Sequence, residues 1–283
     1  MVAGLQVVVP RPAGAAPSAS SAPGAAGVVI VRVESGLDSG WFKAVEASCP
    51  AGTVLYGGGG RISGGSGLVD LLQLLPGDPA AGDHVFRVAA IEGLPFAPRW
   101  RLHAAAVCGP PLAGIERVVS PASVLPASAV GTGAHAVCPA GKVVLSTGGL
   151  ATSPAEAPLH WIRPMGNGTE VFAVVHRDDR VVPTTLASVG AVAICAPAPP
   201  GHEIVATGTQ PTPQGLKVVN AWCPAGKVAV GGALTMFDPG GRGHHHFAGF
   251  VPEDGTDRSF RTEAEGPGGE DWALGSWAIC IAA

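Results

Sequence analysis

The feature that most constrains the fold is the tetrapeptide Cys-Pro-Ala-Gly, which occurs three times with similar surroundings. The copies lie at 49–52, 138–141 and 223–226. Each copy is followed by a short apolar run and then by glycines. Each opening cysteine is matched by a second one, Cys108, Cys195 or Cys280, that lies 59, 57 or 57 positions later. The opening cysteines recur every 85 to 89 residues, so the chain must be interpreted as a repeat protein.

Six cysteines at matching positions predict three disulfides, each within one repeat. Several pairings are possible in principle, but repetition favours one pairing used three times: Cys49 with Cys108, Cys138 with Cys195, and Cys223 with Cys280. Closing loops of this length stabilises each repeat by roughly 4 kcal/mol in the chain-entropy model. Disulfides also indicate an oxidising destination. The alternative is metal ligation, but the repeats contain no Cys-x-x-Cys pair and the histidines do not recur in register.

The repeat divides the 283 residues into an N-terminal arm, 1–26, and three units, 27–110, 111–197 and 198–283. Short β-branched runs recur in each unit between glycines and prolines, and no stretch combines helix caps with a 3.6-residue periodicity. In each unit one of these runs surrounds a phenylalanine, which is Phe86 in the first, Phe172 in the second and Phe260 in the third. Only 68–75 could form a helical turn. We therefore expect an all-β chain of three tandem disulfide-closed β-sandwich or jelly-roll-like repeats, about 85 residues and six strands each.

Several recurring residues have predicted structural roles. The proline after each opening cysteine ends a strand, and Ala-Gly completes a tight turn. The glycines that follow permit a β-bulge or the close approach of another backbone. Trp100 and Trp272 each lie eight positions before their closing cysteine, so we expect both in the core near the disulfides. The second repeat has Ala187 at this position, and Trp161 is expected to fill its core instead.

The repeated motif resembles a known repeat. Lys142 and Lys227 follow the tetrapeptide, and Ala-Ile-Cys closes the second and third repeats. These repeats resemble one found in secreted actinobacterial proteins and in fibre-like or collagen-like surface proteins, including phage ones. Thr53 departs from the lysine of that motif. The resemblance covers about 27–283, implies an extracellular or virion-associated module, and brings no catalytic residues with it.

Charge and hydropathy argue against two kinds of partner. The net charge of −4 and the charged fraction of 13% provide no basic field, so we expect no nucleic acid. No apolar run approaches the roughly 20 residues of a membrane helix, so no membrane insertion is expected. Residues 1–10 lack a basic region and 10–27 are rich in Pro, Ala, Ser and Gly. Either a leader has been removed or the chain leaves by another route, such as a particle released by lysis.

Residues that could carry chemistry are few. His244 and His246 could share one face of a strand and bind a divalent metal, although a polar loop is the favoured interpretation. His160 near Glu156, and His176 near acidic residues, could form base–orienter pairs, but such neighbours are common on surfaces. Seven carboxylates within 253–271 are interpreted as a solvated edge. No Gly-x-Ser-x-Gly elbow is present, and no cofactor is expected.

Two function classes follow. The first is a non-catalytic extracellular or virion-surface structural or adhesion protein, a subunit of a fibre, appendage or particle that self-associates or binds neighbouring subunits. The second is a carbohydrate-binding protein or glycan-active enzyme with one site in a single repeat, whose partner is a cell-surface glycan. Trp41, Trp161 and Trp222 do not align between repeats, so three equivalent sugar platforms are not expected. We prefer the first class, which is not an enzyme.

Overall fold

The structure is a computed structural model, and it describes residues 27–65, 67–78, 82–93, 98–152, 157–177, 186–237, 245–253, 255–266 and 269–283. The predicted all-β class is confirmed, because these residues form nineteen strands and one short 3-10 helix. The predicted N-terminal arm, 1–26, lies outside the described residues.

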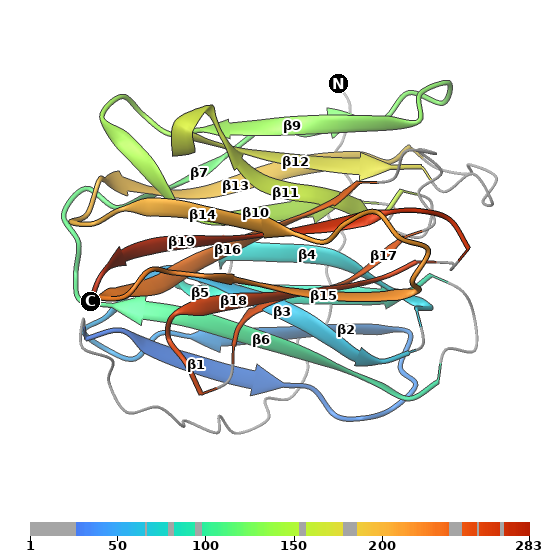
Figure 1. Cartoon of the computed structure of the whole chain (residues 1–283), viewed down its shortest axis with the longest axis horizontal. Coiled ribbons are helices and arrows are strands. Elements are labelled where there is room, and N and C mark those ends of the chain that lie inside the picture. The colour runs from blue at the N-terminus through green and yellow to red at the C-terminus, as the bar shows by residue number, and fades with distance from the viewer. Residues whose placement is uncertain are drawn as a thin grey trace, which may run out of the picture.

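Each repeat contains six strands in the same order, and the second has one further short strand (Figure 1). The first comprises β1 (Val29–Glu34), β2 (Phe42–Ser48), β3 (Val54–Gly64), β4 (Val69–Asp78), β5 (Gly82–Glu92) and β6 (Trp100–Gly109). The second comprises β7 (Glu116–Val119), β8 (Ser123–Val124), β9 (Gly131–Val137), β10 (Lys142–Ala151), β11 (Leu159–Met165), η1 (Gly166–Gly168), β12 (Glu170–His176) and β13 (Ser188–Pro197). The third comprises β14 (Glu203–Gly208), β15 (Leu216–Trp222), β16 (Lys227–Phe237), β17 (His246–Pro252), β18 (Ser259–Glu265) and β19 (Ala273–Ala282).

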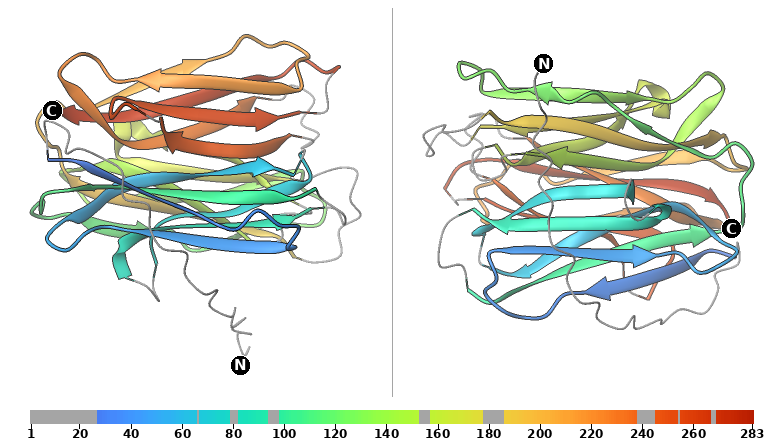
Figure 2. Two further views of the ribbon diagram at one scale, coloured as in Figure 1. Left: turned by 90° about the horizontal axis from the view of Figure 1, so that it is seen from below. Right: turned by 180° about the vertical axis from the view of Figure 1, so that it is seen from behind.

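Each repeat contributes two groups of three neighbouring strands, and the two groups belong to different sheets. Sheet A has the order β1-β6-β3-β17-β18-β15, sheet B β2-β5-β4-β10-β13-β7, and sheet C β14-β19-β16-β11-β12-β9. Repeats therefore meet by antiparallel pairing at three seams, which are β3–β17, β4–β10 and β11–β16. The repeats form one body rather than separate beads, as Figure 1 and Figure 2 show from three sides.

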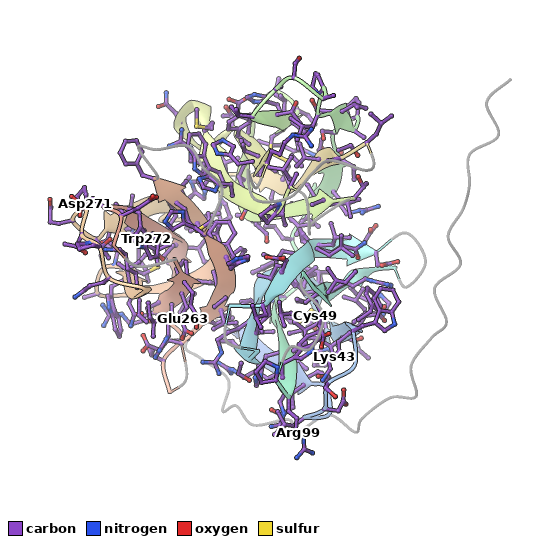
Figure 3. The ribbon with its side chains drawn as sticks, turned by 90° about the vertical axis from the view of Figure 1, so that its right-hand side faces the viewer. Lys43, Cys49, Arg99, Glu263, Asp271 and Trp272 are labelled. Carbon is purple, nitrogen blue, oxygen red and sulfur yellow. A yellow bond between two sulfur atoms is a disulfide. The ribbon has the colours of Figure 1, made fainter. Side chains whose placement is uncertain are left out.

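The three repeats form lobes around a common centre, where strands β3, β10 and β16 contact one another (Figure 3). A Cβ atom added to Gly57 would lie 2.2 Å from the carbonyl oxygen of Val230, and one added to Gly231 would lie 2.2 Å from that of Leu145. The predicted close approach at the glycine runs is thus confirmed, and it occurs between repeats. The third equivalent position is Ser146, whose buried Oγ has no hydrogen-bond partner.

The tetrapeptide also forms the predicted local structures. In each copy the proline carbonyl accepts a hydrogen bond from the residue three positions later, at 3.1, 3.0 and 3.2 Å. Gly52, Gly141 and Gly226 have φ of 84°, 81° and 77°, as the third position of a type II turn requires. The strand that follows each turn then shifts register by one residue, as in a β-bulge.

One prediction about the core needs correction. Trp100 and Trp272 are fully buried, but they do not lie near the disulfides. Trp100 begins β6 and Cys108 lies near its other end, so eight extended residues place their backbones ~26 Å apart. Each tryptophan instead packs against a lysine, because the Nζ atoms of Lys43 and Lys217 lie 4.5 and 5.0 Å from the two ring centroids.

The second repeat has a different core at this point, and the predicted replacement by Trp161 is wrong. Ala187 is buried, and its carbonyl oxygen accepts a hydrogen bond of 2.8 Å from the backbone of Leu125, whose side chain is fully buried. Trp161 is only partly buried, because in β11 it is the neighbouring residue Ile162 that points inward. Leu125 is therefore the large apolar residue beside Ala187.

The strand expected around each phenylalanine is present, as β5, β12 and β18, but the three phenylalanines are not equivalent. Phe86 and Phe260 are fully buried, and a Cβ atom added to Gly232 would lie 2.2 Å from the Phe260 ring. In the second repeat the strand register places Val171 at the equivalent position. Phe172 comes one residue later, and a one-residue offset in a strand turns a side chain to the opposite face.

Residues 69–75 of the apolar run 68–75 lie in strand β4, so the run does not form a helical turn. β4 pairs with β5 along one edge and with β10 of the second repeat along the other. A short apolar run has no periodicity that separates strand from helix, so the tertiary pairing decides its conformation.

Candidate functional site

The six cysteines pair as predicted, with Cα–Cα distances of 5.6, 5.6 and 5.7 Å. Each disulfide lies within one repeat but connects two sheets, because the opening cysteine follows an outer strand of one sheet and the closing cysteine lies within another. The three bonds therefore link sheet A to B, B to C, and C to A. Three such disulfides indicate an oxidising, extracellular environment.

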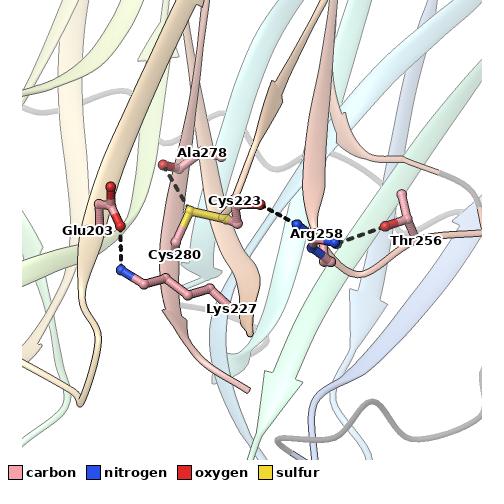
Figure 4. The surroundings of a disulfide bond; sticks show 7 residues. All are labelled: Glu203, Cys223, Lys227, Thr256, Arg258, Ala278 and Cys280. Carbon is pink, nitrogen blue, oxygen red and sulfur yellow. Dashed lines mark hydrogen bonds and ion pairs between the residues drawn. A yellow bond between two sulfur atoms is a disulfide. The ribbon is translucent and has the colours of Figure 1, made fainter. Parts of the chain in front are cut away.

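Near the disulfide, the lysine of the repeated motif forms an ion pair with a residue of the outermost strand (Figure 4). In the third repeat Lys227 forms an ion pair with Glu203 of β14, and in the second Lys142 pairs with Glu116 of β7. Thr53 occupies this position in the first repeat, where its hydroxyl donates to the carbonyl oxygen of Pro50 at 2.7 Å. The departure from the motif thus replaces an ion pair between strands by a contact within the turn.

The predicted metal ligands are only partly described. His244 lies outside the described residues, and Nδ1 of His246 lies 2.5 Å from Oδ1 of the buried Asp70. Within the part of the chain that the structure describes, no group of three or more His, Cys, Asp or Glu side chains could hold a metal ion. The His246–Asp70 contact joins the third repeat to the first, and the metal site stays a prediction.

Three histidines that the sequence does not group together lie beside the seam between β11 and β16, where His160 and His245 are buried and His176 is partly buried. The His160 and His176 rings stack with centroids 4.2 Å apart, and His245 is buried against Trp272. Burial, reinforced by His176 and His245, holds the pKa of His160 well below its ordinary value. The interpretation of His160 as a surface residue is therefore wrong. Glu156 lies outside the described residues, so its pairing with His160 stays a prediction.

On the outer face of sheet A, a serine contacts a histidine, and the histidine contacts a carboxylate. Ser63 Oγ is 2.8 Å from His103 Nε2, and His103 Nδ1 is 3.5 Å from Glu34 Oε2. Serine hydrolases use these groups in this order. Here Ser63 lies within β3 in register with Arg101 of β6, and Glu34 also accepts a 2.8 Å hydrogen bond from Arg101. We assign the contacts to cross-strand pairing of β1, β6 and β3.

A small cleft lies at the seam between β3 and β17, and its volume is about 230 Å³. Glu263 and Glu265 line it, but Glu263 is held by Arg61 at 3.4 Å and by Arg261 at 2.5 Å. This corrects the interpretation of the acidic stretch as a solvated edge for Glu263, whose side chain is only 13% exposed. The volume is below the roughly 300–1,000 Å³ of small-molecule sites.

Large apolar side chains are exposed on β15, the last strand of sheet A. Leu216, Val218 and Trp222 are 57%, 40% and 50% exposed. They point away from the core together with Asn220, while Lys217 and Ala221 between them are buried. The alternation from Lys217 to Trp222 is visible in the sequence, but it does not say which set faces outward.

A second outer surface, on the part of sheet C from the second repeat, carries aromatic side chains. His135 and Phe172 stack with centroids 4.3 Å apart, and Trp161 meets Phe172 edge-on at 6.4 Å. The guanidinium of Arg163 lies 5.1 Å from the Trp161 ring centroid. We call these four residues the aromatic row. It arises because Phe172 and Trp161 face outward, as described above.

Comparison with known proteins adds no relative. No protein-family model matches the chain, and no curated protein matches its sequence. In the described residues no helix has the length and apolar character needed to cross a membrane.

Proposed function

We propose that this chain is a non-catalytic extracellular or virion-surface protein with a structural or adhesive role, a subunit of a fibre, appendage or particle. One observation carries the proposal: a body braced by three disulfides between sheets leaves large apolar side chains exposed on outer strands and loops. Trp41 and Trp222 are 69% and 50% exposed. Exposed aromatic side chains are typical of protein–protein contact surfaces.

The architecture supports a rigid spacer. Every seam between repeats is an antiparallel strand pair, and every disulfide connects two sheets. Such a body has no flexible linker between its repeats, so surfaces on different lobes keep fixed positions. The resemblance of the repeated motif to repeats of secreted and fibre-like surface proteins agrees with this role.

The test is the assembly state of native material. Electron microscopy and fractionation of the source culture should find the chain in filaments, in particles or on cell surfaces. A free monomer that binds neither cells nor particles nor glycans contradicts the proposal.

The aromatic row favours a second candidate, binding of a cell-surface glycan. Sugar rings stack on aromatic side chains, and charged groups such as Arg163 and Glu170 beside His135 provide hydrogen-bond partners. Glycan-array binding that Trp161→Ala abolishes, and that Trp41→Ala on another surface leaves unchanged, supports this candidate. An array without binding contradicts it.

A further inference from the structure

Within the described residues sheet A ends at β15, where backbone groups without a strand partner lie beside exposed apolar side chains. The Gly215 carbonyl accepts a hydrogen bond from Gly266, and the Cys223 amide donates one to Arg258. In an antiparallel ladder alternate residues share one edge, so the odd-numbered residues of β15 bond to β18. The N–H and C=O groups of Leu216, Val218, Asn220 and Trp222 therefore point to the free edge.

The other repeats show what protects such an edge. The equivalent outer strand of the first repeat, β2, places Glu46 outward, where Arg87 holds it at 3.1 Å. The equivalent strand of the second, β9, places His135 outward beside Glu170. Natural edge strands carry charges because a bare apolar edge pairs with other chains. Among these three equivalent strands, β15 alone has no ionisable side chain on its outward face, since Lys217 is turned inward onto Trp272.

We propose that β15 pairs antiparallel with β15 of a second copy of this chain, about a two-fold axis at Val219. The two copies of sheet A then become one continuous sheet. The inference deepens the proposed function and rests on it, because self-pairing of this edge is the first assembly contact of such a subunit.

The register about Val219 is self-complementary. Val219 is the middle of the seven-residue strand, and even-numbered residues then face even-numbered residues, so the free backbone groups meet in about eight hydrogen bonds. Leu216 lies directly opposite Trp222 of the second copy, and Val218 lies opposite Asn220. Directly opposed side chains in an antiparallel pair are close enough to contact each other. Both ends of the interface are therefore apolar, and no like charges face each other across it.

Mass and amide exchange test the pairing in the full-length, oxidised protein. Light scattering after size exclusion should give about 56 kDa, twice the 28.1 kDa of the chain. Hydrogen exchange followed by NMR should show that the amides of Leu216, Val218, Asn220 and Trp222 become protected as concentration rises, whereas those of Lys217 and Val219 are protected at every concentration. A monomer at 100 µM, or an oligomer in which the even-numbered amides stay unprotected, overturns the proposal.

A variant with a matched control tests the side chains. Trp222→Lys should weaken dimerisation at least about 100-fold, because two symmetry-related contacts are lost and 1.4 kcal/mol per contact corresponds to tenfold each. The matched control is Val137→Lys on the outer strand β9. Val137 is exposed and, like Trp222, directly precedes an opening cysteine. This variant should leave the dimer intact. Val218→Lys provides a second variant if Trp222→Lys misfolds, as judged by circular dichroism and disulfide mapping. A dimer that persists in a folded lysine variant overturns the proposal.

Failure of this pairing and failure of the proposed function give different results. A chain that dimerises through β15 but is absent from cells and particles contradicts the proposed function alone. A chain found on particles or cells with its β15 amides unprotected contradicts only the pairing.

Discussion

Removing one disulfide tests whether the three repeats unfold together. In a double variant, Cys223→Ala with Cys280→Ala, the loop of 57 residues is no longer closed. The chain-entropy relation then gives a loss of about 4.2 kcal/mol in the free energy of unfolding. Both cysteines are buried, and alanine introduces no polar group at either position.

The effect of this loss on a thermal scan depends on whether the repeats, which share their sheets, unfold together. If all 283 residues unfold as one unit, the unfolding entropy is about 0.6 kcal/mol/K, and Tm falls by about 7 °C in a single transition. If the third repeat unfolds alone, its roughly 86 residues contribute about 0.18 kcal/mol/K, and its own Tm falls by about 23 °C. Because β15 and β16 belong to sheets shared with the other repeats, we expect the single transition.

Differential scanning calorimetry under non-reducing conditions measures both quantities. The matched double variant of the first repeat, Cys49→Ala with Cys108→Ala, should give nearly the same shift, and intact mass should show that the other two disulfides remain. An early, separate transition with about a third of the total heat would refute the interlocked arrangement.

Three further predictions concern the centre and the buried histidines. Gly231→Ala should lower the free energy of unfolding by about 3 kcal/mol, since the added Cβ atom would lie 2.2 Å from the Leu145 carbonyl oxygen. Gly190→Ala, where the nearest atom lies 4.0 Å away, should change it by less than about 1 kcal/mol in the same denaturant titration. Ser146→Ala should raise it by about 1 kcal/mol, because it removes a buried hydroxyl without a partner. Because burial keeps the pKa of His160 low, the unfolded chain binds a proton that the folded chain does not, and Tm should fall as the pH drops below about 6.5. His160→Gln should flatten this profile, and an unchanged pH profile in that variant contradicts the assignment.

Local features of the chain could be predicted because they depend on few neighbouring residues. The turn at Gly52 needs only the positive φ that glycine adopts at low cost. The strand ends follow from proline, which donates no hydrogen bond. The disulfide pairing followed from repetition, because the same spacing used three times leaves one consistent scheme.

Residues on outer faces and in the seams could not be predicted in the same way. Trp161 was misassigned, and the outward position of Phe172 was not predicted, because a shift of one residue reverses the face of a strand and neither composition nor spacing records that shift. The stacked pair of His160, which is buried, and His176, which is partly buried, has no sequence signal apart from the apolar residues around it. The outward apolar set of β15 becomes clear only when Lys217 is seen packed against Trp272.

The sequence by itself determined an all-β chain, its turns, its bulges and which cysteines bond. Only the tertiary structure decided which strands are neighbours, and therefore that each sheet is shared between two repeats. The physical reason is that backbone hydrogen bonds between strands are alike whichever strand supplies them. The partner is selected by shape at the centre of the molecule, where Gly57 and Gly231 let the strands of different repeats come into contact.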